Sequence, residues 1–346
     1  LMSASMAPAN VRLNPVGLLV AAVIAICIFF YMFGVPGFPG NDRISMRELL
    51  SVSVDLAERG GKRVTEIAEA KMLAAKEKGK TKEGAKEMLT EGDLESHRAI
   101  VNGFLKTYPG ITLISEEHEN KPVDFNQIPD PNKQLEEVLR AVSSDQQIPL
   151  SNIAVWVDPL DATQEYTEGL YKFVTTMVCV VVNGEPTIGV IHKPFEKETV
   201  WAWVDKGHSP NLKKSSDAKP NENERRIIVS RSHAGPVEAV AKKSFGPDTV
   251  VVPAGGAGYK TLEVIKGNVE AYVHVTLIKK WDICAGHAIL KAVDGKMTTL
   301  EGNYITYYPK DNPKVDAGLL ATIEGHYDYL KKLAPEMDTL KGKHKR

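Results

Sequence analysis

The sequence predicts a fold of mixed class, α+β in its first half and α/β in its second. In the second half, strand-like and helix-like segments alternate, which is typical of βαβ units. These segments are strand 226–230, helix 236–243, strand 249–252, helix 259–266, strand 271–275 and helix 281–293. In the first half, two apolar runs, 173–182 and 187–192, flank Asn183-Gly184, which is a strong hairpin signal, and 199–204 adds a third antiparallel strand.

The other segments complete this pattern. The spacing of apolar residues predicts a helix over 45–75, with a kink at Gly60-Gly61, and a second helix over 94–105. Between them, 77–91 is rich in Lys, Glu and Gly, which predicts a solvated, mobile loop. Two short strands, 297–300 and 319–323, and a helix over 327–333 end the chain.

The length and composition are those of an ordinary folded protein. With 346 residues, the chain can bury a large core and form two subdomains, at about 44–205 and 225–334 of a domain that spans 44–334. We expect 1–40 to be a membrane anchor and linker, and 335–346 to be a solvated tail. The formal net charge of −1 argues against a nucleic-acid polymer as partner. Cys27, Cys179 and Cys284 match no zinc spacing or disulfide framework, and we expect them to be packing residues.

The amino-terminal region has the character of a membrane span. Between Arg12 and Asp42 no side chain is charged, and 16–33 is apolar except for Gly17 and Tyr31. These 18 residues would reach about 27 Å as a helix, close to the hydrocarbon thickness of a bilayer. A cleaved signal peptide is the alternative, but its apolar region is normally shorter and ends in a small-x-small site. We therefore predict an uncleaved single-pass anchor over 13–35, whose orientation the flanking charges specify only weakly.

Two carboxylates follow an apolar strand in the stretch Trp156-Val-Asp158-Pro159-Leu160-Asp161-Ala162-Thr163. Pro159 cannot donate a ladder hydrogen bond, so we expect the strand to end there. The turn after it lets Asp158, Asp161 and the carbonyl of Leu160 converge, and two like charges that close repel unless a cation lies between them. Oxygen ligands of this kind suit Mg²⁺, and Thr163 offers a hydroxyl at the first turn of a helix, where free N–H groups attract anions. The stretch predicts a metal ion and a phosphate together; the alternative is a turn in which both acids cap helices.

Four motifs, in order along the chain, carry a family resemblance. They are Thr90-Glu-Gly-Asp93, Ile114-Ser-Glu116-Glu117, Trp156-Val-Asp158-Pro-Leu-Asp161-Ala-Thr163 and Trp281-Asp282-Ile-Cys-Ala-Gly286. Over about 44–334 the sequence resembles the lithium-sensitive, magnesium-dependent phosphatases of the inositol monophosphatase superfamily. The longer form Asp158-Pro-Leu-Asp161-Ala-Thr163-Gln-Glu-Tyr166 is more similar to the 3′-phosphonucleotide phosphatases than to the inositol branch. The resemblance implies a layered α-β-α-β-α sandwich of the sugar-phosphatase type with an amino-terminal transmembrane helix.

The resemblance also implies roles for individual residues. The implied ligands of two or three Mg²⁺ ions are Glu116, Asp158, the carbonyl of Leu160, Asp161 and Asp282. Asp93 and Thr163 resemble the family's water-activating pair, a carboxylate and a hydroxyl that orient the attacking water. The implied substrate contacts are Thr163, Ser230, His233, Gly256 and Lys260, the last supplying positive charge for a second phosphate. Helix capping is the alternative role for Asp282 and Thr163, and a turn position is the alternative for His233.

The sequence also predicts the backbone conformation or role of two turns. The glycines of Ala254-Gly255-Gly256-Ala-Gly258 precede a helix and would let backbone N–H groups approach an anion. Ala162 stands where the family most often has glycine. Because its Cβ disfavours positive φ, we expect helical backbone at that position.

These expectations lead to one function and two alternatives. The resemblance implies a Golgi membrane enzyme with a lumenal catalytic domain that removes the 3′-phosphate of 3′-phosphoadenosine 5′-phosphate, a by-product of sulfotransferases. The sequence contains no N-x-[ST] sequon, so glycosylation adds no support for the lumenal location. The alternatives are an inositol phosphate phosphatase and a catalytically inactive, membrane-anchored binding protein; the presence of every motif acid argues against the second. The sequence leaves the oligomeric state open.

Overall fold

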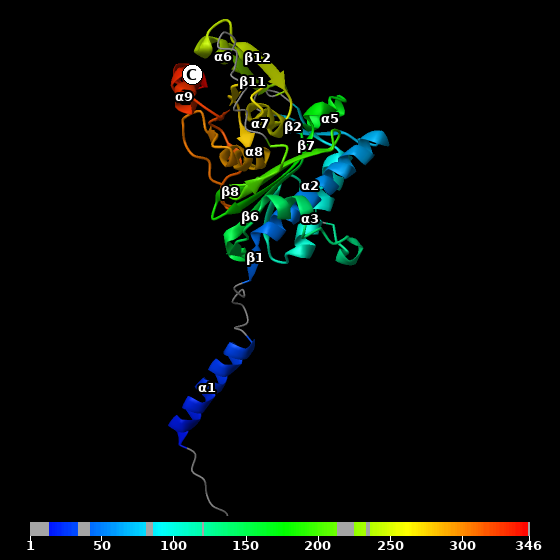
Figure 1. The fold of residues 1–346 in the computed structure, drawn as a ribbon, viewed down its shortest axis with the longest axis vertical. Coiled ribbons are helices and arrows are strands. Elements are labelled where there is room, and N and C mark those ends of the chain that lie inside the picture. Colours follow the sequence, from blue (N-terminus) through cyan, green and yellow to red (C-terminus); the bar gives the residue numbers. More distant parts are fainter. Residues whose placement is uncertain are drawn as a thin grey trace, which may run out of the picture. The chain divides into compact units, whose positions relative to one another are not determined.

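The structure, a computed structural model, describes residues 14–33, 42–80, 86–119, 121–212, 225–232 and 236–344 (Figure 1). The chain divides into two units, Leu1–Asp42 and Arg43–Arg346. In the first unit, α1 (Pro15–Phe33) covers the apolar run. Within the described ranges, no helix combines the length and the apolar character of a membrane span, and the predicted anchor stays a prediction.

Six described strands of the second unit form one sheet, in the order β10-β9-β8-β7-β6-β4. They are β4 (Thr112–Ser115), β6 (Ile153–Asp161), β7 (Thr175–Val182), β8 (Glu185–Lys193), β9 (Glu198–Trp203) and β10 (Gly207–His208). β7 and β8 form the predicted hairpin around Asn183-Gly184, and β9 pairs with β8 in antiparallel fashion, as predicted. α2 (Met46–Glu69) and α3 (Glu91–Thr107) cover one face of this sheet.

Five described strands form a second sheet, in the order β12-β11-β13-β17-β15. They are β11 (Arg226–Ser230), β12 (Val250–Ala254), β13 (Ala271–His274), β15 (Lys296–Thr298) and β17 (Leu319–Thr322). β11 runs parallel to β12 and β13, which confirms the predicted βαβ alternation, whereas β17 is antiparallel to β13 and β15.

Helices lie between the two sheets and outside the second one (Figure 1). α8 (Lys280–Ala292) packs on β6, β7 and β8, and α7 (Ala257–Ile265) packs on α8 and on β11, β13 and β17. On the outer face of the second sheet, α6 (Val237–Phe245) contacts β11, β12 and β13, and α9 (His326–His344) contacts β17. The layers are therefore α-β-α-β-α, which confirms the predicted sandwich.

Short elements complete the second unit. β1 (Arg43–Ser45) pairs with β5 (Gln147–Pro149), and β14 (Ile278–Lys279) pairs with β16 (Lys314–Val315). The short helices are η1 (Phe125–Gln127), α4 (Glu136–Ala141), η2 (Leu150–Asn152), α5 (Thr163–Thr167) and η3 (Tyr171–Phe173). α5 follows β6 directly, so its first turn lies beside the end of that strand.

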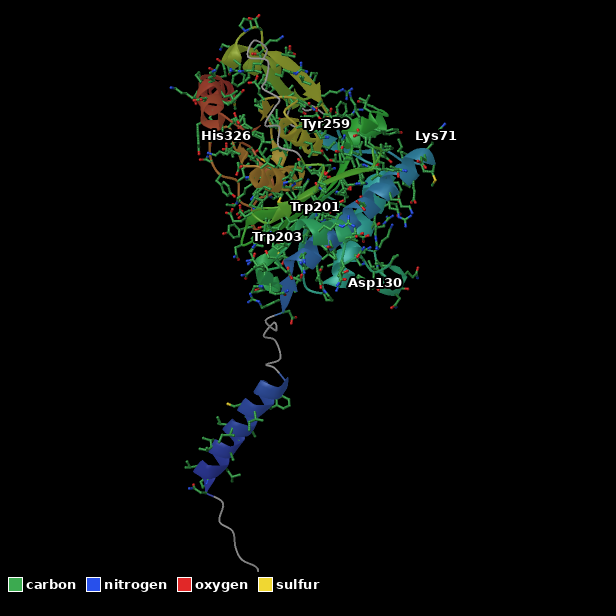
Figure 2. The ribbon with its side chains drawn as sticks, viewed as in Figure 1. Lys71, Asp130, Trp201, Trp203, Tyr259 and His326 are labelled. Carbon is green, nitrogen blue, oxygen red and sulfur yellow. A yellow bond between two sulfur atoms is a disulfide. The ribbon has the colours of Figure 1, made fainter. Side chains whose placement is uncertain are left out.

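Alternate residues of β6 enter two different cores. Val155 and Val157 belong to the core under α2 and α3, whereas Trp156 belongs to the core around α7 and α8. Figure 2 shows Trp201 and Trp203 of β9, which join the first core, and Tyr259 of α7, which packs against the second. Because β6 is buried on both faces, its sequence is a continuous apolar run, and polar residues occur only near its end.

Two glycines let α2 approach its neighbours closely. The helix runs through Gly60 and Gly61, and the predicted kink stays a prediction. A Cβ at Gly60 would lie 2.6 Å from Ile100 Cδ1, and one at Gly61 would lie 2.3 Å from His192 Cδ2. The glycines therefore serve the packing of α2 against α3 and β8, a requirement that helical spacing does not reveal.

Much of the predicted loop 77–91 is a hairpin. β2 (Lys76–Lys80) pairs with β3 (Lys86–Leu89), and 81–85 lies outside the described residues. Lys78 on β2 bonds Glu117, and Lys78 Nζ lies 3.5 Å from Glu116 Oε1. The loop prediction is wrong for these strands because charged contacts with the rest of the unit, absent from the local sequence, hold them.

Two of the cysteines form a disulfide. The bond joins Cys179 of β7 to Cys284 of α8, 105 residues further along the chain. Cys27 is a free, exposed cysteine. The prediction of three packing residues is therefore wrong for Cys179 and Cys284, because the pairing depends on the contact of α8 with the first sheet.

Protonation of a buried histidine should weaken the fold below pH 6.5. His287 of α8 is buried, its Nδ1 lies 2.9 Å from the Tyr307 hydroxyl, and burial lowers its pKa to about 3. Because the unfolded chain binds a proton that the folded chain refuses, this histidine contributes stability that is present above pH 6.5 and is lost as the pH falls toward 3. Acidification from pH 6.5 to 4 should lower the free energy of unfolding by about 3 kcal/mol more in the wild type than in His287→Asn. Urea unfolding across this pH range measures the difference, and equal slopes for the two proteins would contradict it.

Candidate active site

Parallel pairing brings the first two acids together. β4 and β6 align Ser115 with Val157, so the next residues, Glu116 and Asp158, emerge side by side. The Glu116 amide donates to the Val157 carbonyl at 3.1 Å and continues the ladder to this point. Two carboxylates that are 42 positions apart in the chain therefore meet at one edge of the sheet.

Asp282 reaches the same place from the first turn of α8. One carboxylate oxygen from each of Glu116, Asp158 and Asp282 lies within 4.8 Å of the other two. The backbone N–H of Lys279 donates to Asp282 Oδ2 at 2.9 Å, so this acid also caps its helix. Asp282 therefore caps α8 and also belongs to the group of three acids.

β6 continues past the proline through a bulge. Asp158 pairs with Met177 and Asp161 with Thr175, so the β6 side of the pairing holds one more residue than the β7 side. The prediction that the strand ends at Pro159 is wrong, because a bulge accommodates a residue without a ladder N–H. Because Met177 and Thr175 share one face of β7, the extra residue places Asp158 and Asp161 on the same face of the sheet, where both line one pocket.

Asp161 serves a different set of partners. Its Oδ2 accepts from the Gly258 N–H at 2.8 Å and from the Thr175 hydroxyl at 3.3 Å. The N–H groups of the glycine-rich turn therefore do approach an anion, and that anion is the carboxylate of Asp161. Asp161 lines the same pocket as the acid group, although it is not a member of the close set of three.

A threonine and an aspartate form a hydrogen-bonded pair beside the acids. Thr163 Oγ1 lies 3.0 Å from Asp93 Oδ1 and 3.1 Å from the Leu160 carbonyl. Asp93 Oδ2 accepts from the backbone N–H of Thr90 at 2.7 Å and from its hydroxyl at 2.5 Å, which closes a capping box at the start of α3. Burial raises the pKa of Asp93 to about 7. The structure thus joins the predicted pair, although the two residues are 70 positions apart.

The close approach of the acids disfavours their charged forms. Burial, and then the charge of Glu116, raise the pKa of Asp282 to about 8. The same two causes raise the pKa of Asp158 well above its ordinary value. A cation bound among the three groups would remove this penalty, and hard carboxylate oxygens are the donors that Mg²⁺ takes. The donor set therefore fits the predicted metal.

Two lysines that sequence analysis missed partly neutralise this group. Lys78 Nζ lies 3.5 Å from Glu116 Oε1, and Lys279 Nζ lies 3.6 Å from the same oxygen. Lys279 also pairs with Glu87 of β3 at 3.1 Å. The position of Lys279 just before the Trp281-Asp282 motif is a signal that could have identified it. No local signal identifies Lys78, whose surroundings read as a solvated loop.

One pocket collects most of the predicted site residues. Of the predicted residues, it is lined by Glu116, Asp158, Leu160, Asp161, Thr163, Ser230, Gly256, Lys260 and Asp282. Asp93 reaches the pocket through Thr163, and His233 lies outside the described residues. The buried ammonium of Lys260 donates to the Gly256 carbonyl at 2.5 Å and to the Ala254 carbonyl at 3.4 Å. Burial lowers the pKa of Lys260 to about 8.

Ala162 adopts the conformation that its Cβ disfavours. Its φ of 70° and ψ of 42° are left-handed, so the prediction of helical backbone there is wrong. The turn must carry the chain from the bulge of β6 into α5, and this geometry outweighs a local preference of about 1–2 kcal/mol.

Ala162→Gly should therefore stabilise the protein by about 1 kcal/mol, because glycine enters this region without the penalty. The matched control is Ala239→Gly at an exposed position of α6, which should destabilise by about 1 kcal/mol through the ordinary loss of helix propensity. Urea unfolding of both variants measures the two effects. Destabilisation by Ala162→Gly would contradict the left-handed assignment.

Comparison with known proteins identifies the class. The model of the inositol monophosphatase family matches residues 45–338, and the chain belongs to this family of phosphatases, which use Mg²⁺. The Golgi-resident adenosine 3′,5′-bisphosphate 3′-phosphatase of Rattus norvegicus is 41% identical over 359 residues, which cover 96% of this chain and 99% of that protein. Inositol monophosphatase 3 of Danio rerio is 44% identical over 346 residues, which cover 95% and 98%. The crystal structure of inositol monophosphatase II from Staphylococcus aureus has the same fold, with a TM-score of 0.61 at 19% identity, over 86% of this chain and 97% of that one.

Proposed function

We propose that this phosphatase is a Mg²⁺-dependent, lithium-sensitive enzyme that removes the 3′-phosphate of 3′-phosphoadenosine 5′-phosphate to give AMP and phosphate. The observation that carries the reaction type is the group of Glu116, Asp158 and Asp282 beside the hydrogen-bonded pair Thr163 and Asp93. The substrate rests on similarity to the 3′-phosphatases over nearly the whole chain. We place the catalytic domain at 44–334.

The acid group would hold the metal. Glu116, Asp158 and Asp282 would be ligands, together with Asp161 and the carbonyl of Leu160, which face the same pocket. Mg²⁺ held there would supply positive charge to the phosphoryl oxygens of a bound ester. The acids contribute by lying close together before the metal arrives, so that little rearrangement accompanies binding.

Thr163 and Asp93 would handle a proton. The Thr163 hydroxyl has one hydrogen, which it can donate to Asp93 or to the Leu160 carbonyl, and its oxygen can then accept from a water molecule in the pocket. Asp93 keeps that hydroxyl oriented, because two hydrogen bonds from Thr90 hold its other oxygen. A water so oriented is placed to attack phosphorus, and the raised pKa of Asp93 suits a group that takes up a proton near neutral pH.

The substrate contacts are Ser230, His233, Gly256 and Lys260. Ser230 and Gly256 lie at the pocket wall, where β11 ends and α7 begins. The ammonium of Lys260 donates to the Gly256 carbonyl, so we expect its positive charge to act on the second phosphate mainly through the field in the pocket.

A comparison of two substrates tests this proposal. Purified protein with Mg²⁺ is assayed for phosphate release from 3′-phosphoadenosine 5′-phosphate and from inositol 1-phosphate, with LiCl added in a parallel series. We expect a higher kcat/KM for the nucleotide and inhibition by lithium. Faster hydrolysis of inositol 1-phosphate would refute the nucleotide substrate and favour an inositol phosphate phosphatase. That activity is the second candidate function, because some relatives are named inositol monophosphatase 3. Failure to hydrolyse either ester would favour an inactive binding protein.

We further propose a single-pass anchor in the Golgi membrane with the catalytic domain in the lumen. The apolar run 16–33, the Golgi-resident relatives and the Cys179–Cys284 disulfide support this location, because disulfides persist in oxidising compartments. Protease treatment of sealed Golgi vesicles tests it. Protection of the domain until detergent is added is the expected result, and digestion of the domain in intact vesicles would refute it.

A further inference from the structure

The disulfide lies next to two of the three acids. Cys284 follows Asp282 by two residues in the first turns of α8. Cys179 of β7 lies opposite Trp156 of β6 in the antiparallel ladder. Asp158 follows Trp156 by two residues, so the two side chains lie on the same face of β6. The bond therefore connects the helix that carries Asp282 to the strand beside the one that carries Asp158.

An aromatic contact also joins β6 to α8. The rings of Trp156 and Trp281 lie 6.3 Å apart, centroid to centroid, and each tryptophan stands close in sequence to one of the acids. The indole N–H of Trp156 donates to the Tyr307 carbonyl at 3.0 Å, which holds that ring in place. Trp156, Cys179 and Cys284 are nearly inaccessible to solvent, at 1%, 1% and 0% exposure. The link is thus embedded in the core and is no surface crosslink.

Electrostatic repulsion among the acids acts against this link. Metal binding requires these three carboxyl groups, which lie within 4.8 Å of one another, to ionise, and they then repel one another. Glu116 follows β4 and Asp158 lies in β6, whereas Asp282 belongs to α8. Repulsion therefore acts across the boundary between α8 and the sheet, where the disulfide crosses it. If α8 could withdraw, metal binding would have to bring the helix back, and the affinity would fall by the free energy of that return.

We propose that Cys179 and Cys284 are positioning residues of the metal centre, whose disulfide holds Asp282 against Glu116 and Asp158 and thereby makes metal affinity depend on the redox state of this pair. Reduction by a dithiol breaks the S–S bond: the reagent gives two electrons and two protons, both cysteines become thiols, and the reagent becomes a disulfide. Oxidation is the reverse exchange with a disulfide donor. The inference rests on the proposed function only in requiring that the three acids bind a divalent cation.

Mn²⁺ binding tests the proposal without reference to catalysis. Free Mn²⁺ is measured by electron paramagnetic resonance in titrations of the wild type, of the wild type treated with dithiothreitol until thiol titration shows both buried cysteines reduced, and of Cys179→Ala/Cys284→Ala. We expect the dissociation constant to rise about tenfold on reduction and in the double variant, as is typical when support of a metal ligand is lost. The double variant should not respond to dithiothreitol. Cys27→Ala should respond as the wild type does, because Cys27 is outside the disulfide.

Two further variants separate positioning from general stability. Val240→Ala truncates a buried side chain of α6, in the outer core, and should lower Tm while leaving Mn²⁺ affinity unchanged. Cys179→Val/Cys284→Ala refills the core without the bond, and should recover part of the Tm but none of the affinity. Full recovery of affinity in that variant, or an equal loss of affinity in Val240→Ala, would overturn the proposal.

The outcomes also distinguish this inference from the proposed function. Equal Mn²⁺ affinity in the oxidised and reduced wild type would refute the positioning role and leave the function intact. Absence of Mn²⁺ binding to the oxidised wild type would refute the metal centre itself.

Discussion

Asp158→Asn is expected to lower kcat for phosphate release by about a thousandfold while the protein stays folded. The reason is that Asp158 is the most enclosed of the three acids, at 1% exposure, and a neutral amide there weakens the site for Mg²⁺. Loss of the metal's charge stabilisation, several kcal/mol, corresponds to about three powers of ten in rate. Steady-state assays at saturating substrate and at a Mg²⁺ concentration that just saturates the wild type measure the effect.

The same substitution should stabilise the metal-free protein. Burial and the neighbouring acids raise the pKa of Asp158, which means that its charged form opposes folding at neutral pH, so removing the charge relieves that opposition. We expect a higher Tm than the wild type in EDTA. Asp205→Asn, at an exposed turn, should change neither rate nor Tm. Wild-type turnover in Asp158→Asn would remove this residue from the mechanism.

Gly189→Ala should destabilise the protein by about 3 kcal/mol. Gly189 lies in β8 against α8, and a Cβ there would stand 2.2 Å from the Ala285 carbonyl oxygen and 2.9 Å from Ile289 Cγ1. The oxygen belongs to the helix backbone, so the clash is relieved only if α8 moves away from the sheet, which is costly in a closely packed core. Urea unfolding with an unchanged m-value measures the loss.

The matched control is Gly79→Ala in β2. A Cβ at Gly79 would meet no atom closer than Glu87 Oε2 at 3.5 Å, so the change should leave stability within about 0.5 kcal/mol. Because α8 carries Asp282, Gly189→Ala should also weaken Mn²⁺ binding, whereas Gly79→Ala should not alter α8. A Gly189→Ala protein as stable as the wild type would show that the contact between β8 and α8 is looser than the structure indicates.

Elements with a strong local signal were predictable. Asn183-Gly184 flanked by apolar runs predicted β7 and β8, and Thr90 with Asp93 stands at the start of α3, where the structure shows a capping box. Segments whose conformation depends on distant partners were not predictable. Lys78 is held by Glu116 and Glu117 nearly 40 positions away, so β2 and β3 read as a solvated loop.

Turn geometry shows the same division. Pro159 and Ala162 have clear local preferences, and both predictions made from them were wrong. The last part of β6 must place Asp158 beside Glu116 and also bring Asp161 to the Gly258 N–H. Satisfying both requires a bulge and a left-handed residue, since tertiary contacts together outweigh local preferences of about 1–2 kcal/mol.

By itself the sequence singled out Glu116, Asp158, Asp161 and Asp282, which line one pocket in the structure, because carboxylates at the ends of apolar segments can be recognised without coordinates. It also determined the family, through four motifs in order. Only the tertiary structure decided that Glu116, Asp158 and Asp282 form the close group while Asp161 accepts a hydrogen bond from the first turn of α7, and that Cys179 bonds Cys284. The physical reason is that these relations depend on the register of β4 with β6 and on the seating of α8 against the sheet, which are distances between segments far apart in the chain.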